Sequence, residues 1–319
     1  MTAADFAISL DMVNRHYQEP NRNRYESKYF WEELYRLISA AGFRAIEVPY
    51  EPVWQFGGRS GVPFTRYCVN AKYGDTARYR SFLANNGIDE IAGVTFDPNL
   101  FMRNDNLDFY FGATGHFAGE ALDHAADLGA GYFAVSPTPY CGRVRHYHPN
   151  LDEASFIART RELLASLAEQ AERADIRLAV RNEYWSMLRG DRLFDMLDGL
   201  PGSVRIDADV ASLQIGGTDP VVFIQDHFDR IGSVHLTDTS FVDDDETWKT
   251  ANPEFPARRP TQVYRDLGEG SVNLKAVYAS LQQLGYSGAI TCSCRQTRDH
   301  VRALLRMRAY IKNQLAAAH

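Results

Sequence analysis

The chain is poor in cysteine and in basic residues, and it has no long apolar run. Its four cysteines are too few for a disulfide framework in 319 residues, and none forms a Cys-x-x-Cys pair, so we expect reduced thiols in or near the core. The apolar stretches fall far short of the ~18 residues that cross a bilayer, and no basic start precedes an apolar block. We therefore expect a cytoplasmic protein without a membrane span.

Lysine and arginine number 34 against 41 aspartates and glutamates, which gives a net charge of −7. Nucleic acids and anionic membranes select clustered basic residues, so we expect neither as a partner. The remaining composition, 45% hydrophobic and 24% charged, is that of a soluble globular protein with a sizeable core. With no internal repeat and no shift in composition, residues 1–319 predict a single domain.

Short β-like runs alternate with helical patterns along the chain. The strand candidates are residues 6–13, 44–50, 90–96, 132–138, 176–183, 203–210, 231–238 and 288–294. The helical patterns repeat apolar residues at 3.6-residue spacing, as in Val301, Leu304, Leu305, Tyr310 and Ile311. Eight strand and helix pairs predict an α/β fold, a single (βα)8 TIM barrel. A doubly wound sheet is the alternative, but the first strand lacks the glycine-rich turn typical of that fold.

Connections from strands to helices are long, and those back to strands are short and often marked by glycine. The long connections are residues 51–73, 97–110, 139–151 and 239–272. We interpret GGRSG (57–61) and GATGH (112–116) as loop residues. Strand-to-helix loops emerge at the carboxyl face of a barrel, which places the predicted binding site there. The segment 239–272 is too long for a mere connector and predicts a lid or a surface that docks another subunit.

Polar residues gather at the predicted carboxyl ends of the strands. Glu183, Asp207 and His235 come from three neighbouring strands, so two carboxylates and an imidazole converge at one barrel mouth. Such a set suits a divalent cation of the Mn²⁺, Mg²⁺, Co²⁺ or Zn²⁺ type, with open positions for substrate oxygens. The alternative is that the acids pair with barrel arginines such as Arg181 and Arg205, and that His235 is a satisfied interior histidine.

Several segments together carry a resemblance to a known family. They are GFRAIEVPYEP (42–52), RIDADVASLQIGGTDP (205–220), VHLTDT (234–239) and GEGSVNLKAVYASLQQLGYSGAI (268–290). The His-x-x-Asp of strand seven is similar to the family's His-x-Lys-Asp, and a Gly-Glu-Gly turn opens the helix that follows. By these motifs the chain resembles the sugar phosphate isomerase/epimerase family, whose xylose-isomerase-like barrels include ketose 3-epimerases, hydroxypyruvate isomerase and inosose dehydratase. The similarity runs nearly from end to end.

The resemblance implies one divalent metal, Mn²⁺ first, held by a Glu, an Asp, a His and a Glu at the ends of strands five to eight. Asp207 and His235 match the family's Asp and His. Arg181 stands in the register of the first Glu, with Glu183 two residues further on the same face, and Ser293 stands at the second Glu. Without that second Glu, the symmetrical two-base exchange of the epimerases is broken. The resemblance therefore implies a reaction with one base on a keto-sugar or keto-polyol. This reaction is either an isomerisation or a dehydratase-type elimination.

The acid/base group of such a reaction has three candidates. They are Glu183 and the two histidines of the strand-four loop, His146 and His148, which could equally be exposed and idle. The predicted substrate-binding residues are Glu47, Trp54, Arg181, Trp185 and Asp238. Aromatic walls suit a sugar or polyol ligand, although the same side chains could pack loops against the barrel rim.

Other functions stay open. Some relatives of the family cleave 3-oxo-glycosides together with a small second subunit. The long loop after strand seven (239–272), which we call the strand-seven loop, is compatible with a lyase of that kind. It is also compatible with a homo-oligomer. Arg181 and Ser293 at expected ligand positions are compatible with a non-catalytic sugar-binding barrel. An apurinic-site nuclease on this fold would need a basic rim and a histidine-rich site, and the sequence favours neither.

Overall fold

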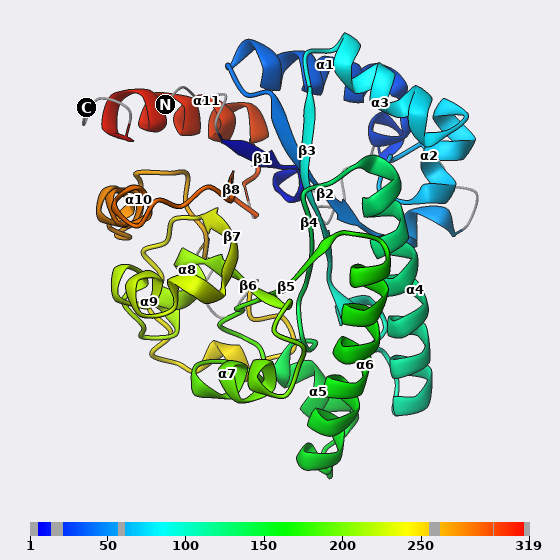
Figure 1. The fold of residues 1–319 in the computed structure, drawn as a ribbon, viewed down its shortest axis with the longest axis vertical. Helices are drawn as coiled ribbons and strands as arrows, with labels where there is room; N and C mark the ends of the chain where they lie inside the picture. Colours follow the sequence, from blue (N-terminus) through cyan, green and yellow to red (C-terminus); the bar gives the residue numbers. More distant parts are fainter. Residues whose placement is uncertain (1–5, 14–21, 57–60, 255–261, 296, 316–319) are drawn as a thin grey trace.

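A computed structural model describes residues 6–13, 22–56, 61–254, 262–295 and 297–315. Parallel strands form a closed barrel in chain order, with β8 pairing back to β1, and helices surround it (Figure 1). The strands are β1 (Ala7–Ser9), β2 (Ala45–Tyr50), β3 (Glu90–Phe96), β4 (Tyr132–Val135), β5 (Arg177–Arg181), β6 (Arg205–Asp209), β7 (Ile231–Leu236) and β8 (Ala289–Cys292). Each predicted strand candidate contains one of these strands, so the predicted TIM barrel is confirmed.

The helices follow the strands around the outside of the barrel, and α4 and α6 pack against each other (Figure 1). The α-helices of the described residues are α1 (Lys28–Ala40), α2 (Arg66–Tyr73), α3 (Thr76–Asn85), α4 (Leu107–Leu128), α5 (Cys141–Tyr147), α6 (Glu153–Arg173), α7 (Asp191–Asp198), α8 (Val210–Ile215), α9 (Pro220–Asp226), α10 (Leu274–Gln283) and α11 (His300–Tyr310). Shorter turns are η2 (Leu10–Met12), η3 (Arg22–Glu26), η4 (Pro52–Gln55), η5 (Pro98–Leu100), η6 (Phe228–Arg230), η7 (Thr247–Lys249) and the π-helical η8 (Ile311–Leu315).

Some predicted loops are helical. GATGH lies inside α4, whose N-cap Asn106 accepts a hydrogen bond from the backbone N–H of Phe109. Gly115 has a packing reason, because a Cβ built on it would lie 3.3 Å from Leu163 of the neighbouring α6. The predicted connections 51–73 and 139–151 contain α2 and α5. Most of GGRSG lies outside the described residues.

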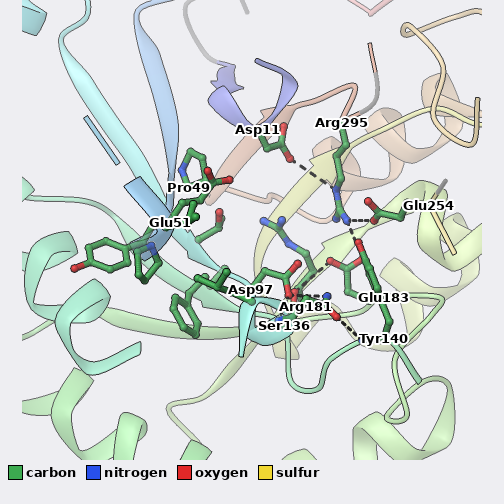
Figure 2. A pocket seen from close by; sticks show the side chains of 18 of the residues that line it. Asp11, Pro49, Glu51, Asp97, Ser136, Tyr140, Arg181, Glu183, Glu254 and Arg295 are labelled. Carbon is green, nitrogen blue, oxygen red and sulfur yellow. Dashed lines mark hydrogen bonds and ion pairs between the residues drawn. The ribbon is translucent and has the colours of Figure 1, made fainter. Parts of the chain in front are cut away.

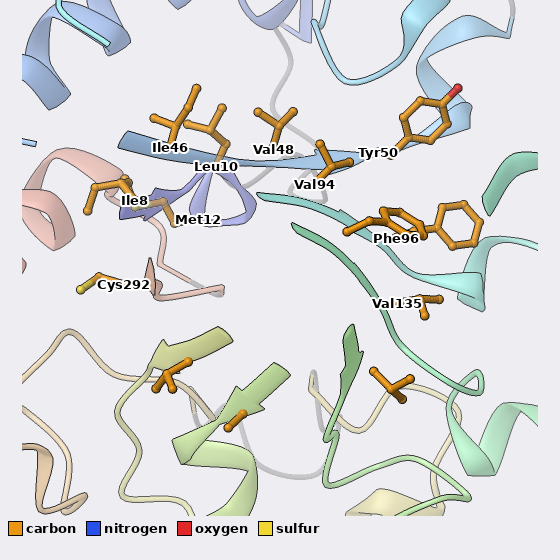
Figure 3. Packing of buried hydrophobic residues seen from close by; sticks show 14 of the residues in the cluster. Ile8, Leu10, Met12, Ile46, Val48, Tyr50, Val94, Phe96, Val135 and Cys292 are labelled. Carbon is orange, nitrogen blue, oxygen red and sulfur yellow. The ribbon is translucent and has the colours of Figure 1, made fainter. Parts of the chain in front are cut away.

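The core has two parts, one between the barrel and the helices and one inside the barrel. Outward strand residues such as Ile8, Ile46 and Val94 join the large cluster that the helices cover (Figure 3). The smaller cluster comes almost entirely from strands and is made of small side chains around one large ring: Ala7, Ala45, Ala92, Ala134, Ala179 and Tyr132. The barrel interior is therefore filled by alanines, by Tyr132 and by polar groups.

Two expectations about the whole chain concern thiols and membranes. All four cysteines are buried and none of them forms a disulfide, as expected for reduced thiols. Among the residues that the structure describes, the helices are too short or too polar to cross a membrane.

Candidate active site

A cavity of about 560 Å³ opens at the carboxyl ends of the strands. Its walls include the last residues of β2, β3 and β5, which are Tyr50, Phe96 and Arg181. Glu183 and Arg295 also face it, and the strand-seven loop contributes Glu254 (Figure 2). The cavity thus lies where the length of the strand-to-helix connections predicts the binding site.

Arg181 is at the centre of a group that we call the inner cluster, made of Glu47, Arg181, Asp207 and His235. Its Nε donates to Asp207 Oδ2 at 2.5 Å, and its Nη2 lies 3.2 Å from Glu47 Oε2 and 2.8 Å from His235 Nε2. The parallel pairing of β5 and β6 sets Arg181 directly beside Asp207. All four side chains are buried.

The carboxylates of the inner cluster are also held from the barrel interior. Glu47 accepts hydrogen bonds from Ser9 Oγ and from the Tyr132 hydroxyl, both at 2.6 Å, and Asp207 Oδ1 accepts one from Ser233 Oγ at 2.6 Å. Every carboxylate oxygen of the cluster therefore has a donor among the protein side chains. These bonds fix both acids in place beneath Arg181.

Charges within the inner cluster favour ionised groups despite burial. Burial raises the pKa of Glu47, but His235 and Arg181 outweigh it and hold this pKa far below its usual range. Burial also raises the pKa of Asp207, and Arg181 and His235 bring it below its ordinary value. Burial and Arg181 lower the pKa of His235, whereas Asp207 and Glu47 outweigh them and raise it.

A second guanidinium organises what we call the Arg295 cluster, made of Arg295, Asp11, Glu183, Asp209 and Glu254. Arg295 Nη1 donates to Glu183 Oε2 at 3.0 Å and to Glu254 Oε1 at 2.9 Å. Its Nη2 donates to Asp209 Oδ2 at 3.3 Å, and its Nε lies 3.7 Å from Asp11 Oδ2. One cation thus serves four carboxylates, so negative charge is in excess. Figure 2 shows three of these acids, Asp11, Glu183 and Glu254, around Arg295.

Glu183 has an environment that raises the pKa of its carboxyl group. It accepts a hydrogen bond from Ser136 Oγ at 3.3 Å and is almost completely buried. Burial raises its pKa to about 7, because the opposing effects of Arg295 and Arg181 are smaller and Glu254 and Asp209 add to the rise. A carboxylate with this pKa can accept and return a proton near neutral pH.

The predicted metal ligands do not come together. Asp207 Oδ1 lies 3.7 Å from His235 Nε2, but Glu183 belongs to the Arg295 cluster. Among the described residues, no group of three or more His, Cys, Asp or Glu side chains is arranged to hold a metal ion. The donor atoms that a divalent cation would need are bound to Arg181, so the implied metal does not fit the residues present. The alternative pairing of the acids with Arg181 agrees with this geometry.

The other predicted site residues have varied environments. Trp54 and Trp185 are buried, and their indole N–H groups donate to Glu51 and Glu254. Asp238 accepts backbone hydrogen bonds and does not line the cavity. Neither His146, which is exposed, nor His148 lines it.

Sequence reasoning missed Asp11, Asp209, Glu254 and Arg295 as site residues. Asp209 is the last residue of β6 and Arg295 follows β8, so both stand at strand ends, where site residues of a barrel are expected. Asp11 follows β1 and accepts a hydrogen bond from Ser293 Oγ at 2.5 Å, which shows what Ser293 does at the position of the absent glutamate. Glu254 lies far into a loop, and no sequence signal places it at the cavity.

Comparisons with known proteins agree with the architecture. A sequence profile described as xylose isomerase-like TIM barrel matches residues 35–313. Inosose dehydratase of Lacticaseibacillus casei is 29% identical over 106 residues, which are 33% of this chain and 35% of that protein. The match thus spans about a third of the length of this curated relative.

Solved structures show the same fold at low identity. L-ribulose 3-epimerase superposes with a TM-score of 0.69 at 16% identity, over 99% of this chain and 95% of that one. The probable 3-DHS dehydratase AsbF from Bacillus anthracis gives 0.68 at 13% identity, over 98% and 100% of the two chains. The profile match covers most of the sequence. The chain belongs to the xylose isomerase-like TIM barrel family.

Proposed function

We propose that the protein is a sugar-modifying enzyme that removes a proton next to the carbonyl of a keto-sugar or keto-polyol. The observation that carries this proposal is a buried carboxylate, Glu183, that lines a cavity together with two guanidinium groups, those of Arg181 and Arg295. The related inosose dehydratase and the structurally similar epimerase and dehydratase have names that fit this class of chemistry.

In the proposed reaction Glu183 is the base. It takes the proton from the carbon beside the carbonyl, and negative charge develops on the carbonyl oxygen. Arg181 and Arg295, which both line the cavity, supply cationic hydrogen-bond donors for that oxygen. For isomerisation, Glu183 then returns the proton to the former carbonyl carbon, while the hydroxyl proton of the adjacent carbon moves to the former carbonyl oxygen. For dehydration, the protonated Glu183 gives its proton to the departing hydroxyl group, which leaves as water while the carbonyl forms again.

A hydroxyl-rich substrate suits the cavity better than a strongly anionic one. Asp11 and Glu254 line it as hydrogen-bond acceptors for hydroxyl groups, and both are already close to Arg295. An anionic substrate would have to compete with the carboxylates for the same guanidinium. No step of the proposed reaction passes through the predicted Mn²⁺, because its ligand atoms are bound to Arg181.

Proton exchange with solvent tests the proposal directly. Candidate keto-sugars and inososes are incubated with the enzyme in D₂O, and NMR follows deuterium incorporation beside the carbonyl together with product formation. We expect Glu183→Gln to lower the exchange rate by about 10²- to 10⁴-fold, the usual contribution of a positioned base. Glu169→Gln, an exposed acid on α6, is the matched control and retains the rate.

The outcome separates the alternative functions. Sugar binding without exchange, seen by calorimetry, would indicate the non-catalytic binding barrel. Release of an aglycone from a 3-oxo-glycoside, with a second subunit added, would indicate the lyase. Normal turnover by Glu183→Gln would remove Glu183 from the mechanism.

A further inference from the structure

The inner cluster has the composition of a cation site, with two carboxylates and an imidazole facing one point. The point they face is the guanidinium of Arg181. Its Nε contacts Asp207, and its Nη2 contacts both Glu47 and His235, at 2.5 to 3.2 Å. Protein ligands therefore surround this cation on several sides, as they would surround a metal ion.

The remaining side of the guanidinium is open to the cavity. Arg181 lines the cavity, and its Nη1 has no hydrogen-bond partner within the described part of the chain. Nη1 is not one of the polar atoms that are fully buried without a partner, which means that it is accessible. The cavity is the open space that Arg181 lines. Arg181 thus presents one free N–H donor group to a ligand, in the way that a catalytic metal keeps one open coordination position.

Charge balance argues against a second cation in the same place. Arg181 is permanently protonated and offsets one of the two buried carboxylates, Glu47 and Asp207. The cluster carries a net charge between −1 and 0, depending on His235. Beside Arg181, a divalent ion would bring an excess of positive charge into a buried space. To take the place of Arg181, it would have to displace a side chain that is only 7% exposed.

The guanidinium is also fixed from both ends. Arg181 is the last residue of β5, so its backbone belongs to the barrel ladder. Its partner acids are held by Ser9, Tyr132 and Ser233 from the barrel interior. If Arg181 left the cluster, these two buried acids would lose their cation, and breaking a buried ion pair in this way is strongly destabilising.

We propose that Arg181 is the resident cation of the barrel centre, that it takes the place of a divalent metal among Glu47, Asp207 and His235, and that its Nη1 is the electrophilic contact for a substrate oxygen. The protein therefore binds no divalent cation at these three residues. This inference goes beyond the proposed reaction, since metal binding is measured without any sugar.

The test begins with the wild-type chain, purified after growth with added Mn²⁺. We expect less than about 0.1 equivalent of Mn, Co or Zn by elemental analysis. Added protein should leave the EPR amplitude of free Mn²⁺ unchanged, and neither EDTA nor Mn²⁺ should shift Tm. About one bound equivalent that is lost in Asp207→Asn or His235→Gln would overturn the proposal.

Opening the cluster gives the complementary test. Arg181→Ala leaves two carboxylates and an imidazole around an empty space, so we expect this variant to gain about one equivalent of Co²⁺, with visible absorption bands of a bound ion. Arg181→Lys keeps the positive charge and should not gain the site. Adding His235→Gln to Arg181→Ala should abolish the gained absorption.

The outcomes remain separable from those of the proposed function. A folded Arg181→Ala variant that binds no Co²⁺ would contradict the assignment of the inner cluster as a cation site. If Arg181→Ala does not fold, the wild-type metal measurements still decide the proposal. Turnover assays enter neither test, so an inactive protein with the expected metal behaviour would sink only the proposed function.

Discussion

Two buried glutamates at the same barrel mouth have pKa values shifted in opposite directions, down for Glu47 and up for Glu183. Glu47 touches Arg181 and His235, whose positive charges overcome the cost of burial and keep it ionised. Glu183 shares Arg295 with Asp11, Asp209 and Glu254. Burial outweighs the effects of Arg295 and Arg181 on Glu183, and the charges of Glu254 and Asp209 add to the rise of its pKa. Glu47 is therefore a fixed counter-ion, whereas Glu183 can change its protonation state near neutral pH.

This difference predicts the pH dependence of activity. Burial raises the pKa of Glu183 to about 7, so below that pH the group is increasingly protonated and cannot act as a base. We expect kcat/KM to fall about tenfold per pH unit below 7 and to level off above it. A rate profile from pH 5 to 9 measures this. Any residual exchange by Glu183→Gln should lack the inflection, and an unchanged inflection in that variant would assign it to another group.

At the scale of elements, the strand-seven loop is held by one carboxylate. Asp238 Oδ2 accepts hydrogen bonds from the backbone N–H groups of Gly268 and Gly270 at 2.8 and 3.0 Å. Its Oδ1 accepts those of Thr239 and Val272 at 2.9 and 3.2 Å. The Gly-Glu-Gly turn fits here because a Cβ on Gly270 would lie 2.1 Å from Asp238 Oδ1. The Asp of the His-x-x-Asp motif and the Gly-Glu-Gly turn thus bind each other, which joins the two ends of this loop.

We predict that Asp238→Asn loosens this loop. The amide keeps the size of the side chain but loses the charge and one acceptor oxygen, so two of the four backbone N–H groups lose their partner. We expect a loss of about 1–3 kcal/mol in the free energy of unfolding, measured by urea denaturation. We also expect faster proteolysis within residues 239–272 and a higher KM, because Glu254 lies on this loop.

Asp244→Asn is the matched control for Asp238→Asn. Asp244 lies on the same loop and is exposed. This variant should change neither stability nor proteolysis. Equal behaviour of the two variants would contradict the role given to Asp238.

The elements differ in how well the sequence predicts them. Strand runs such as AIEVPY are buried on both faces, so they stand out from their surroundings. The buried face of a helix is harder to predict. In α11, the apolar pattern predicts Val301 and Leu305 on the buried face, but they are 39% and 53% exposed. Ala303 and Met307 are buried instead. The glycines of GATGH predict a loop, but the segment is helical and Gly115 serves close helix packing, which only the tertiary structure shows.

The candidate site was predictable only in part. Asp207 and His235 are recognisable because side chains at strand ends of a barrel must face the mouth. Which cation they meet depends on the rotamer of Arg181, and a sequence does not contain that information. The orientation of the Glu183 side chain depends on its hydrogen bond with Arg295, which comes from the segment after β8. This long-range contact is not visible in the sequence.

At the scale of the whole molecule, the barrel interior depends on one large ring among small residues. Tyr132 fills the space between Ala7, Ala45, Ala134 and Ala179, and its hydroxyl donates to Glu47. A Cβ built on Gly93 would lie 2.3 Å from Tyr132 Cζ, so the ring fits only because that position of β3 has no side chain. The position of Glu47 in the inner cluster thus depends on how Tyr132 packs inside the barrel.

We therefore predict that Gly93→Ala disturbs both stability and the inner cluster. The added methyl group forces the Tyr132 ring away, which we expect to cost about 1–3 kcal/mol in the free energy of unfolding, as for overpacked cores. Tyr132→Phe removes only the hydroxyl and separates the loss of the Glu47 hydrogen bond from the steric effect. Gly112→Ala in α4, where a Cβ meets nothing within 4 Å, should instead stabilise the protein by about 0.5–1 kcal/mol. Urea denaturation of the three variants measures these changes, and a neutral Gly93→Ala would show that the barrel interior can rearrange around the ring.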